Sequence, residues 1–229
     1  MQCCEKWYYF INSNTPFISI AGDCVSLLAV IIYWQTLRQI SKQSSTIEKQ
    51  QFDSTFFQLI SIHHNILNSI DLRTQGIATS IGHDCFKVFY ERLHEKLKID
   101  NPDNVIGKDV ISLDKALLSF GVEYNRSKGD LNHYFYNLYN IFSYIDNSKF
   151  RNEKFYANTI ISQLSAYEQY MLFYFALSDF CAVDFKSIIE SYHVFKNLFT
   201  NFTKMNDTYI DTSLIGTFKS NYSKSAFED

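Results

Sequence analysis

Arg126 and His133, with six residues between them, are the pair in this sequence best suited to acid–base chemistry. A histidine can transfer protons near neutral pH, and an arginine can stabilise the negative charge of a phosphate. A pair of this kind could cleave a phosphodiester. Short motifs also arise by chance, and the sequence favours the alternative of an exposed loop arginine and a histidine satisfied within a helical bundle.

Two other sets of polar residues also suggest a site. His63 and His64 are adjacent, and neighbouring side chains on a helix point about 100° apart, so they are poorly placed to ligate one metal. We expect one of them in the core and the other in solvent. Glu168 and Gln163 lie in the most apolar predicted helix, where a buried carboxylate needs a partner such as His133 or a tyrosine hydroxyl. We expect a structural network there rather than an active site.

Composition narrows the function classes further. The sequence lacks a Walker-type glycine loop, a Gly-x-Ser-x-Gly elbow, a His-Glu-x-x-His helix and a paired-cysteine zinc pattern. We therefore expect no cofactor, no metal and no enzymatic activity. The net charge of -3 argues against sequence-specific nucleic-acid binding, which leaves protein and lipid as partners. Five cysteines without a Cys-x-x-Cys pair indicate reduced thiols in a cytoplasmic domain.

The first structural element that the sequence predicts is an apolar stretch from Phe17 to Trp34. Eighteen helical residues cover about 27 Å, just under the roughly 30 Å of a bilayer core. Asp23 costs up to roughly 3 kcal/mol at mid-bilayer, and eight aliphatic residues offset it at about 0.3 to 0.6 kcal/mol each. We expect a transmembrane helix over residues 17–37, and the alternative is a buried core helix from Cys24 to Trp34.

The flanks of this stretch predict its orientation. Arg38, Lys42 and Lys49 follow it, whereas only Lys6 precedes it, so the C-terminal bulk is expected in the cytoplasm. Tyr33 and Trp34 lie at the cytoplasmic boundary, where amphipathic rings are favoured. An intramembrane carboxylate faces a protein interface or a water-filled path, so Asp23, with these two rings, is the candidate for membrane or oligomer function.

The rest of the sequence predicts an all-α fold, a transmembrane helix continuing into a cytoplasmic multi-helix bundle. Only seven Gly and two Pro occur, and the 21 Phe and 16 Tyr predict a core built largely from rings. We predict an extracytoplasmic N-terminus at 1–16, the span at 17–37, a helical stalk at 38–51 that could pair with copies of itself, a helical domain at 52–200 and a polar, loosely held tail at 201–229.

Within the helical domain, hydrophobic periodicity predicts individual helices. A polar loop is expected at 73–80, a turn at Asn101–Asn104, and an N-cap at Asp130. The helix at 150–178 becomes apolar on every face and is expected to lie at the centre of the bundle. The predicted helices are 52–72, 86–97, 108–124, 130–145, 150–178 and 184–199.

Short blocks spread over residues 52–198 resemble the AbiC-like phage abortive infection family. The blocks are Phe52–Leu59 with His64 and Asn65, Gly82 with Phe86, His133–Tyr139, and Tyr156–Asn158 with Gln163–Ser165, Glu168 and Leu172–Tyr174. The family-pattern residues are Gly82, His133, Tyr134, Phe135, Asn137, Tyr139, Gln163 and Glu168. Two arginines of the family pattern are replaced here by His83 and Tyr136, so a function that depends on them does not carry over.

The resemblance implies a membrane-tethered anti-phage effector, a toxin that arrests or kills the infected cell. Similar proteins accompany retron reverse transcriptases, which implies a homo-oligomer held in check by a reverse transcriptase and its RNA–DNA product. Two alternatives remain open: a membrane-tethered ribonuclease that resembles HEPN domains, using Arg126 and His133, and a non-toxic scaffold subunit for the reverse transcriptase complex.

Overall fold

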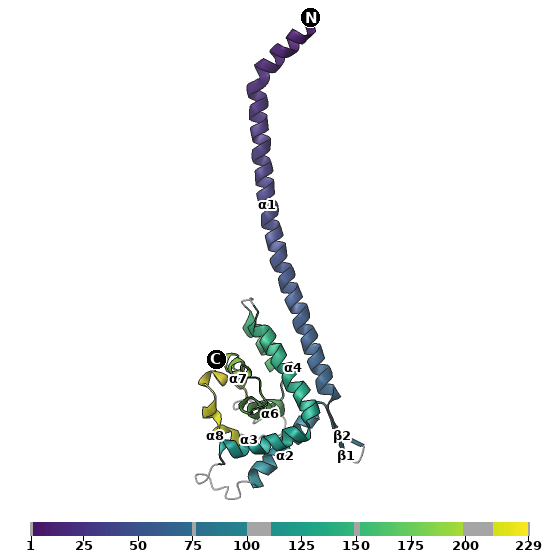
Figure 1. Ribbon diagram of the computed structural model, residues 1–229, viewed down its shortest axis with the longest axis vertical. Coiled ribbons are helices and arrows are strands. Elements are labelled where there is room, and N and C mark those ends of the chain that lie inside the picture. Colours follow the sequence, from purple (N-terminus) through teal and green to yellow (C-terminus); the bar gives the residue numbers. More distant parts are fainter. Residues whose placement is uncertain (1, 75–76, 100–110, 149–151, 199–212, 229) are drawn as a thin grey trace. The chain divides into compact units, whose positions relative to one another are not determined.

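The computed structural model describes residues 2–74, 77–99, 111–148, 152–198 and 213–228. The chain forms two compact units, Met1–Ser54 and Thr55–Asp229, and the division falls inside the first helix. The chain is mostly helical, as predicted, and Figure 1 gives the order of its elements along the sequence.

The first unit is the N-terminal part of helix α1 (Gln2–Ser69). Its part from Asp23 onward is long and apolar enough to cross a membrane, and its most apolar segment is not buried in the protein at all. Val25, Leu27 and Val30 each expose about two thirds of their surface. The alternative of a core helix at Cys24–Trp34 is therefore wrong for this fold. The predicted stalk at 38–51 is helical.

The second unit begins with the last turns of α1, which lead into a hairpin of β1 (Asp71–Thr74) and β2 (Ile77–Ile81). The strands are antiparallel, and Asp71 lies opposite Ile81. The predicted loop at 73–80 is wrong for its described residues, which lie in these two short strands, while the prediction of a mostly helical chain holds. β-branched residues in the second strand favour extended backbone over helix. Gly82 ends the hairpin with a φ of 62°, which a glycine adopts without strain.

Helices build the rest of this unit. They are α2 (His83–Ile99), α3 (Leu113–Arg126), α4 (Lys128–Asp146), α5 (Glu153–Ile161), α6 (Ala166–Leu177), α7 (Phe185–Ser191) and α8 (Ser213–Thr217). Helix α6 lies at the centre and contacts α2, α3 and α7 (Figure 1). Its rings Tyr170, Phe173 and Tyr174 are fully buried, which confirms the predicted central helix.

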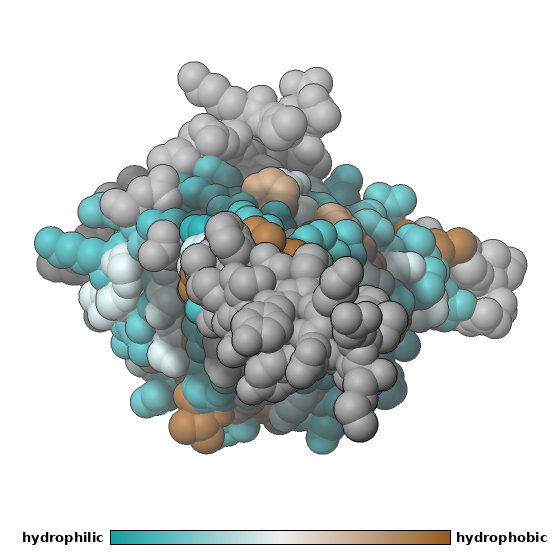
Figure 2. Space-filling model, turned by 90° about the horizontal axis from the view of Figure 1, so that it is seen from above, coloured by the Kyte–Doolittle hydropathy of each residue, from teal (hydrophilic) through white to brown (hydrophobic). Residues whose placement is uncertain are grey.

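The core of the second unit is aromatic, as the composition predicts. Phe135 stacks on Phe175 with ring centroids 4.3 Å apart, and Tyr124 stacks on Phe180 at 4.4 Å. Large rings bury much apolar area each and gain further from stacked and edge-on contacts. The face seen in Figure 2 is mostly hydrophilic among the residues coloured there, with hydrophobic atoms in separate patches.

Several predicted helix boundaries are wrong. The single helix at 150–178 is two helices, because Ser165 caps the start of α6 and the chain turns at residues 162–165. Helix α4 starts at Lys128 after Ser127, so Asp130 lies in its first turn and is not its N-cap. The last predicted helix, 184–199, is helical only over α7, and the described residues after Ser191 form turns. The predicted turn at 101–104 and the start of the helix predicted at 108–124 lie outside the described residues.

The C-terminal segment is not the loosely held tail that the sequence predicts. Residues 199–212 lie outside the described part, but residues 213–228 pack on the bundle. Ile215, Phe218 and Ala226 are buried, and the Tyr222 hydroxyl donates to the carbonyl oxygen of Phe173 at 2.7 Å. Widely spaced aromatic residues among polar ones carry this packing, so no regular period revealed it.

Candidate functional site

A buried polar site in the second unit is built around the carboxylate of Glu168. Glu168 is only 1% exposed and lies in the first turn of α6, where it forms a capping box with Ser165. The Ser165 backbone N–H donates to Glu168 Oε2 at 2.8 Å, and the Glu168 N–H donates to Ser165 Oγ at 3.2 Å. A Ser-x-x-Glu sequence at a helix start forms this reciprocal arrangement, which satisfies two backbone donors.

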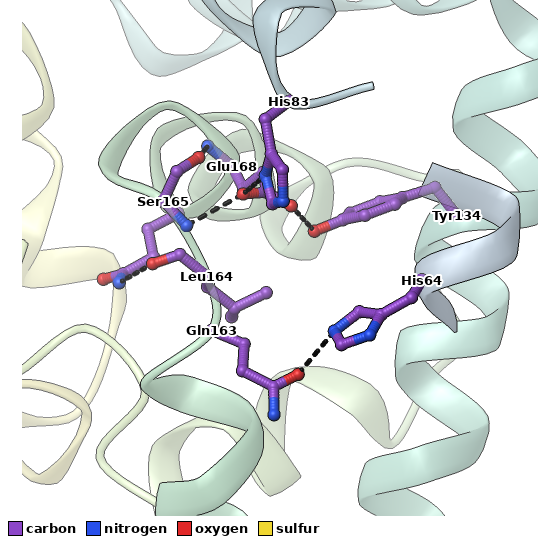
Figure 3. Close-up of polar contacts among 8 residues, drawn as sticks. His64, His83, Tyr134, Gln163, Leu164, Ser165 and Glu168 are labelled. Atoms are coloured by element: carbon purple, nitrogen blue, oxygen red, sulfur yellow. Dashed lines mark hydrogen bonds and ion pairs between the residues drawn. The ribbon is translucent and has the colours of Figure 1, made fainter. Parts of the chain in front are cut away.

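Two side chains from other elements complete the shell of the carboxylate. Tyr134 on α4 donates its hydroxyl to Glu168 Oε1 at 2.6 Å, and His83 at the start of α2 donates Nδ1–H to Oε2 at 3.1 Å (Figure 3). We call Glu168, Ser165, Tyr134 and His83 the Glu168 cluster. The predicted tyrosine hydroxyl is confirmed. The predicted partner His133 is wrong, because His133 is exposed on α4 while its neighbour Tyr134 faces the core.

These contacts keep Glu168 ionised. Burial by itself raises the pKa of this carboxyl, but hydrogen bonds from His83, Ser165 and Tyr134 outweigh it, so its pKa lies below the ordinary value. The hydrogen bond to Glu168 raises the pKa of His83 despite partial burial. Burial, and then the negative charge of Glu168, raises the pKa of Tyr134 well above its ordinary value. The tyrosine therefore keeps its proton, and His83 and Glu168 form an ion pair when His83 is protonated.

Next to this cluster, the two adjacent histidines of α1 take different environments. His63 is 2% exposed, contacts Asn137 Oδ1 through Nδ1 at 3.2 Å and lies 4.7 Å from the ring of Tyr134. Burial lowers the pKa of His63 to about 4, so its imidazole is neutral and donates to Asn137. His64 is exposed and contacts Gln163 Oε1 through Nε2 at 2.8 Å (Figure 3). One histidine is thus in the core and one in solvent, as predicted.

Five of the eight family-pattern residues meet in this region. Gly82 positions the start of α2 and donates its N–H to the carbonyl of Ile70 at 2.9 Å. The other four, Tyr134, Asn137, Gln163 and Glu168, make the contacts described above. The remaining three lie elsewhere on α4. The Phe135 ring stacks on Phe175, the Tyr139 hydroxyl donates to Asp184 at 3.0 Å, and the His133 side chain is exposed.

From the sequence, His83 stood out only as a departure from the family pattern and was not predicted to contact Glu168. The pattern that could have indicated this contact is a Gly-His pair at the start of a helix, where the imidazole can reach a carboxylate on a neighbouring element. A carboxylate that holds an imidazole by Nδ1 can orient a general base. Here the neighbouring Asp84 adds further negative charge, which disfavours a polyanionic substrate. Among the described residues no group of three or more histidine, cysteine or acidic side chains could hold a metal.

Arg126 and His133 are not joined by a hydrogen bond or ion pair in the described structure. Arg126 ends α3 and donates to Glu123 Oε2 at 3.2 Å, while Arg92 donates to Glu123 Oε1 at 3.3 Å. Glu123 is buried, so its two arginines compensate a charge that is removed from water. Arg126 therefore has a structural partner, and His133 lies in the second turn of the next helix.

The membrane candidates Asp23, Tyr33 and Trp34 lie on α1 in the first unit. All three are exposed, and the guanidinium of Arg38 lies 5.2 Å from the Trp34 ring centroid. A cation over an indole face is an attractive contact, and the two side chains together mark the polar end of the apolar segment.

Comparison with known proteins gives one match. Residues 126–203 match the family described as "Putative phage abortive infection protein". The match covers about a third of the chain, from the end of α3 past α7, and includes Tyr134, Asn137, Gln163 and Glu168. It supports a role in anti-phage defence, and it is shorter than the region 52–198 over which the sequence resembles the AbiC-like family. No curated protein and no solved structure matches the chain.

Proposed function

We propose that this chain is a membrane-anchored effector of an anti-phage abortive infection system, which acts by oligomerising and disrupting the bacterial inner membrane. The observation that carries the proposal is the exposed apolar segment of α1. Between Asp23 and Trp34 its large hydrophobic side chains expose from about half to two thirds of their surface. An apolar surface of this extent on a soluble protein marks an interaction with membrane or protein.

Membrane insertion covers this surface over the whole circumference of the helix. Apart from Asp23 and Ser26, apolar side chains surround the helix in this segment, whereas a helix that docks on one protein surface needs only one apolar stripe. The neighbouring Arg38, Lys42 and Lys49 favour a cytoplasmic position for the second unit. Asp23 is then the intramembrane carboxylate, and oligomerisation gives it an environment away from lipid.

The second unit is proposed to keep the effector inactive until infection. A reverse transcriptase with its RNA–DNA product is the proposed restraining partner, and the Glu168 cluster is a means of linking such a partner to α1. His63 and His64 on α1 contact Asn137 on α4 and Gln163 between α5 and α6. A change in the bundle would therefore alter the contacts of the last turns of α1.

We prefer this proposal to a ribonuclease. The ion pair of Arg126 with Glu123 gives the arginine a structural role, and His133 has no bond to it in the described structure. The preference is tested by the RNA readout of the experiment below, with His133→Ala as the decisive variant. A scaffold role is tested by the same experiment, because a scaffold expressed alone leaves growth unchanged.

The experiment is to induce the chain alone in bacteria and to record growth, membrane potential and RNA integrity together. We expect growth arrest and depolarisation with intact RNA. Asp23→Leu should increase membrane insertion and abolish toxicity, whereas His133→Ala should remain toxic. Depolarisation that survives in Asp23→Leu would remove Asp23 from the mechanism. RNA cleavage that precedes depolarisation and disappears in His133→Ala would replace the proposal by the ribonuclease.

A further inference from the structure

A single seam with a repeat of seven runs along α1 through both the apolar segment and the stalk. The seam consists of the positions from 23 to 47 that follow one another at alternating spacings of three and four residues. These are Asp23, Ser26, Val30, Tyr33, Leu37, Ile40, Ser44 and Ile47. In heptad notation the first of each pair is an a position and the second a d position. This spacing keeps the eight residues on one side of a helix that is slightly supercoiled.

In the apolar segment the seam carries an aspartate and a serine, followed by Val30 and Tyr33. Residues 23–34 contain one aspartate and one serine, Asp23 and Ser26, and both lie on the seam. In a bilayer, helices associate through small and polar side chains, because lipid tails solvate apolar side chains as well as another helix does. The seam is therefore the face that a helix in lipid would hide.

Beyond Trp34 the seam is mostly aliphatic. Between residues 35 and 50 the aliphatic residues are Leu37, at the end of the predicted span, and Ile40 and Ile47 in the stalk, and all three lie on the seam beside Ser44. Each of the three exposes about half of its surface. In water, helices associate by burying such a stripe. The seam thus gathers the aspartate and the serine of the apolar segment and the aliphatic side chains that follow it, as the two solvents require.

The charges of the stalk lie away from the seam. Arg38 occupies a b position, and Lys42 and Lys49 occupy f positions, on the outside of a coiled coil. The positions that flank the seam hold Ser41, Gln43, Glu48 and Gln50. In a parallel in-register assembly Gln43 of one copy faces Glu48 of the next, so the flanks bring no two like charges together.

We infer that the seam from Asp23 to Ile47 is the interface between parallel, in-register copies of this same chain. The two ends of the seam identify the occupant, because the covering surface must be polar beside Asp23 and Ser26 and aliphatic beside Leu37, Ile40 and Ile47. A second copy provides such a surface at every position. The inference deepens the proposed function, since it names the surface through which the effector oligomerises.

The seam also predicts the size of the assembly. Leu37 is an a residue, and Ile40 and Ile47 are d residues. Leucine at a with isoleucine at d favours trimers or tetramers over dimers. In such an assembly the Asp23 side chains of all copies face a common axis, where water can reach them. An assembly of this kind opens a polar path near one end of the span.

Cysteine scanning of the full chain in membranes tests the interface. Cys3, Cys4, Cys24 and Cys181 are replaced by serine, the fully buried Cys85 is kept, and one further cysteine is placed in turn at positions 35–49. Oxidation should cross-link copies through positions 37, 40, 44 and 47, and at least fivefold less through 38, 42, 45 and 49. Cross-links of three or more chains should appear with a trifunctional maleimide. Equal cross-linking at all positions, or a maximum on another face, would overturn the inference.

Exchanging neighbouring residues provides matched variants with unchanged composition. Ile40→Ser with Ser41→Ile moves an aliphatic residue off the seam, and Ser26→Leu with Leu27→Ser moves a polar one. Each should lower cross-linking through a cysteine at 47 at least fivefold, whereas Ser45→Thr with Thr46→Ser should not.

If exchanged chains stay in the membrane and still depolarise it, the seam is wrong and the proposed function stands. If the unaltered chain neither enters the membrane nor depolarises it, the proposed function itself fails.

Discussion

Two segments of this chain are similarly apolar and have opposite environments. In α6, residues 170–176 are buried on every face, whereas in α1 the aliphatic residues from Val25 to Ile32 are exposed. Helix α6 has 12 residues, about 18 Å, and is too short to cross a bilayer. The apolar segment of α1 continues into a polar helix and is long enough. Length and flanking residues, more than hydropathy, separate a core helix from a membrane helix.

The protein packs other side chains on the apolar segment of α6 but not on that of α1. Aromatic rings from other elements surround α6, including Phe135, which stacks on Phe175, and Phe195, whose ring centroid lies 5.5 Å from that of Phe173. No part of the most apolar window of α1 is buried in the protein. A change of residue should therefore act on folding in α6 and on membrane binding in α1.

The largest effect is expected from charges placed in the apolar segment of α1. Leu28→Lys together with Ile31→Lys should cost about 6 kcal/mol of insertion free energy. Cell fractionation should find the variant outside the membrane, with the unfolding of its second unit unchanged. Gln39→Lys with Gln43→Lys adds the same charge to the stalk and should stay in the membrane. Equal release of both variants would show that charge, and not the apolar segment, decides the location.

In α6 a truncation should act on folding. Phe173 is fully buried, and Phe173→Ala should lower the free energy of unfolding by about 4 kcal/mol, measured by urea denaturation in mild detergent. Its matched control is Phe155→Ala, because Phe155 is 55% exposed on α5 and its loss should cost less than about 1 kcal/mol. Neither variant should change the fraction of protein in the membrane. A similar cost for both would contradict the central position of α6.

The polar side of α6 should contribute somewhat less. Glu168→Ala removes the acceptor of the Ser165 N–H in the capping box of α6 and the acceptor of the buried Tyr134 hydroxyl, and should cost about 3 kcal/mol of unfolding free energy. Glu168→Gln keeps an oxygen acceptor and should cost about a third as much. The same urea titration measures both. An alanine variant as stable as the wild type would mean that the Glu168 cluster does not support the fold.

The smallest expected effect is a dependence on pH. The pKa of buried His63 is lowered to about 4, so the unfolded chain binds a proton that the folded chain does not as pH falls below 6.5. This histidine should cost about 2 kcal/mol of stability between pH 7 and pH 5. His83 acts in the opposite direction: its raised pKa contributes stability that is fully present below 6.5 and is lost as pH rises through the folded pKa.

The two histidines can be separated by thermal unfolding at pH 7 and pH 5. His63→Gln should lose less stability at pH 5 than the wild type, and His83→Gln should lose more. Both directions follow from the signs of the two pKa changes. An identical pH dependence in all three proteins would show that neither histidine titrates as its environment in the structure requires.

The sequence predicted the parts of the structure that depend on local pattern. The apolar period placed the amphipathic helices, and the buried Glu168 was expected to need a partner such as His133 or a tyrosine hydroxyl, of which the tyrosine is the one found. The hairpin at residues 71–81, the partner His83 and the packing of Phe218 and Tyr222 were missed, because each depends on contacts with residues distant in the sequence. The split between α5 and α6 was missed although Ser165 and Glu168 form a recognisable capping box.

The central claim, that the apolar segment of α1 crosses the membrane, is tested most directly by labelling from one side. Chains that keep the buried Cys85 and carry one further cysteine, either Cys4 or Val183→Cys at a fully exposed position of the second unit, are expressed at a level that leaves the membrane potential intact, and spheroplasts are treated with an impermeant maleimide. Cys4 should react in intact spheroplasts, and the thiol introduced by Val183→Cys only after the inner membrane is permeabilised. If both cysteines react only after permeabilisation, the segment does not cross the membrane and the account is wrong.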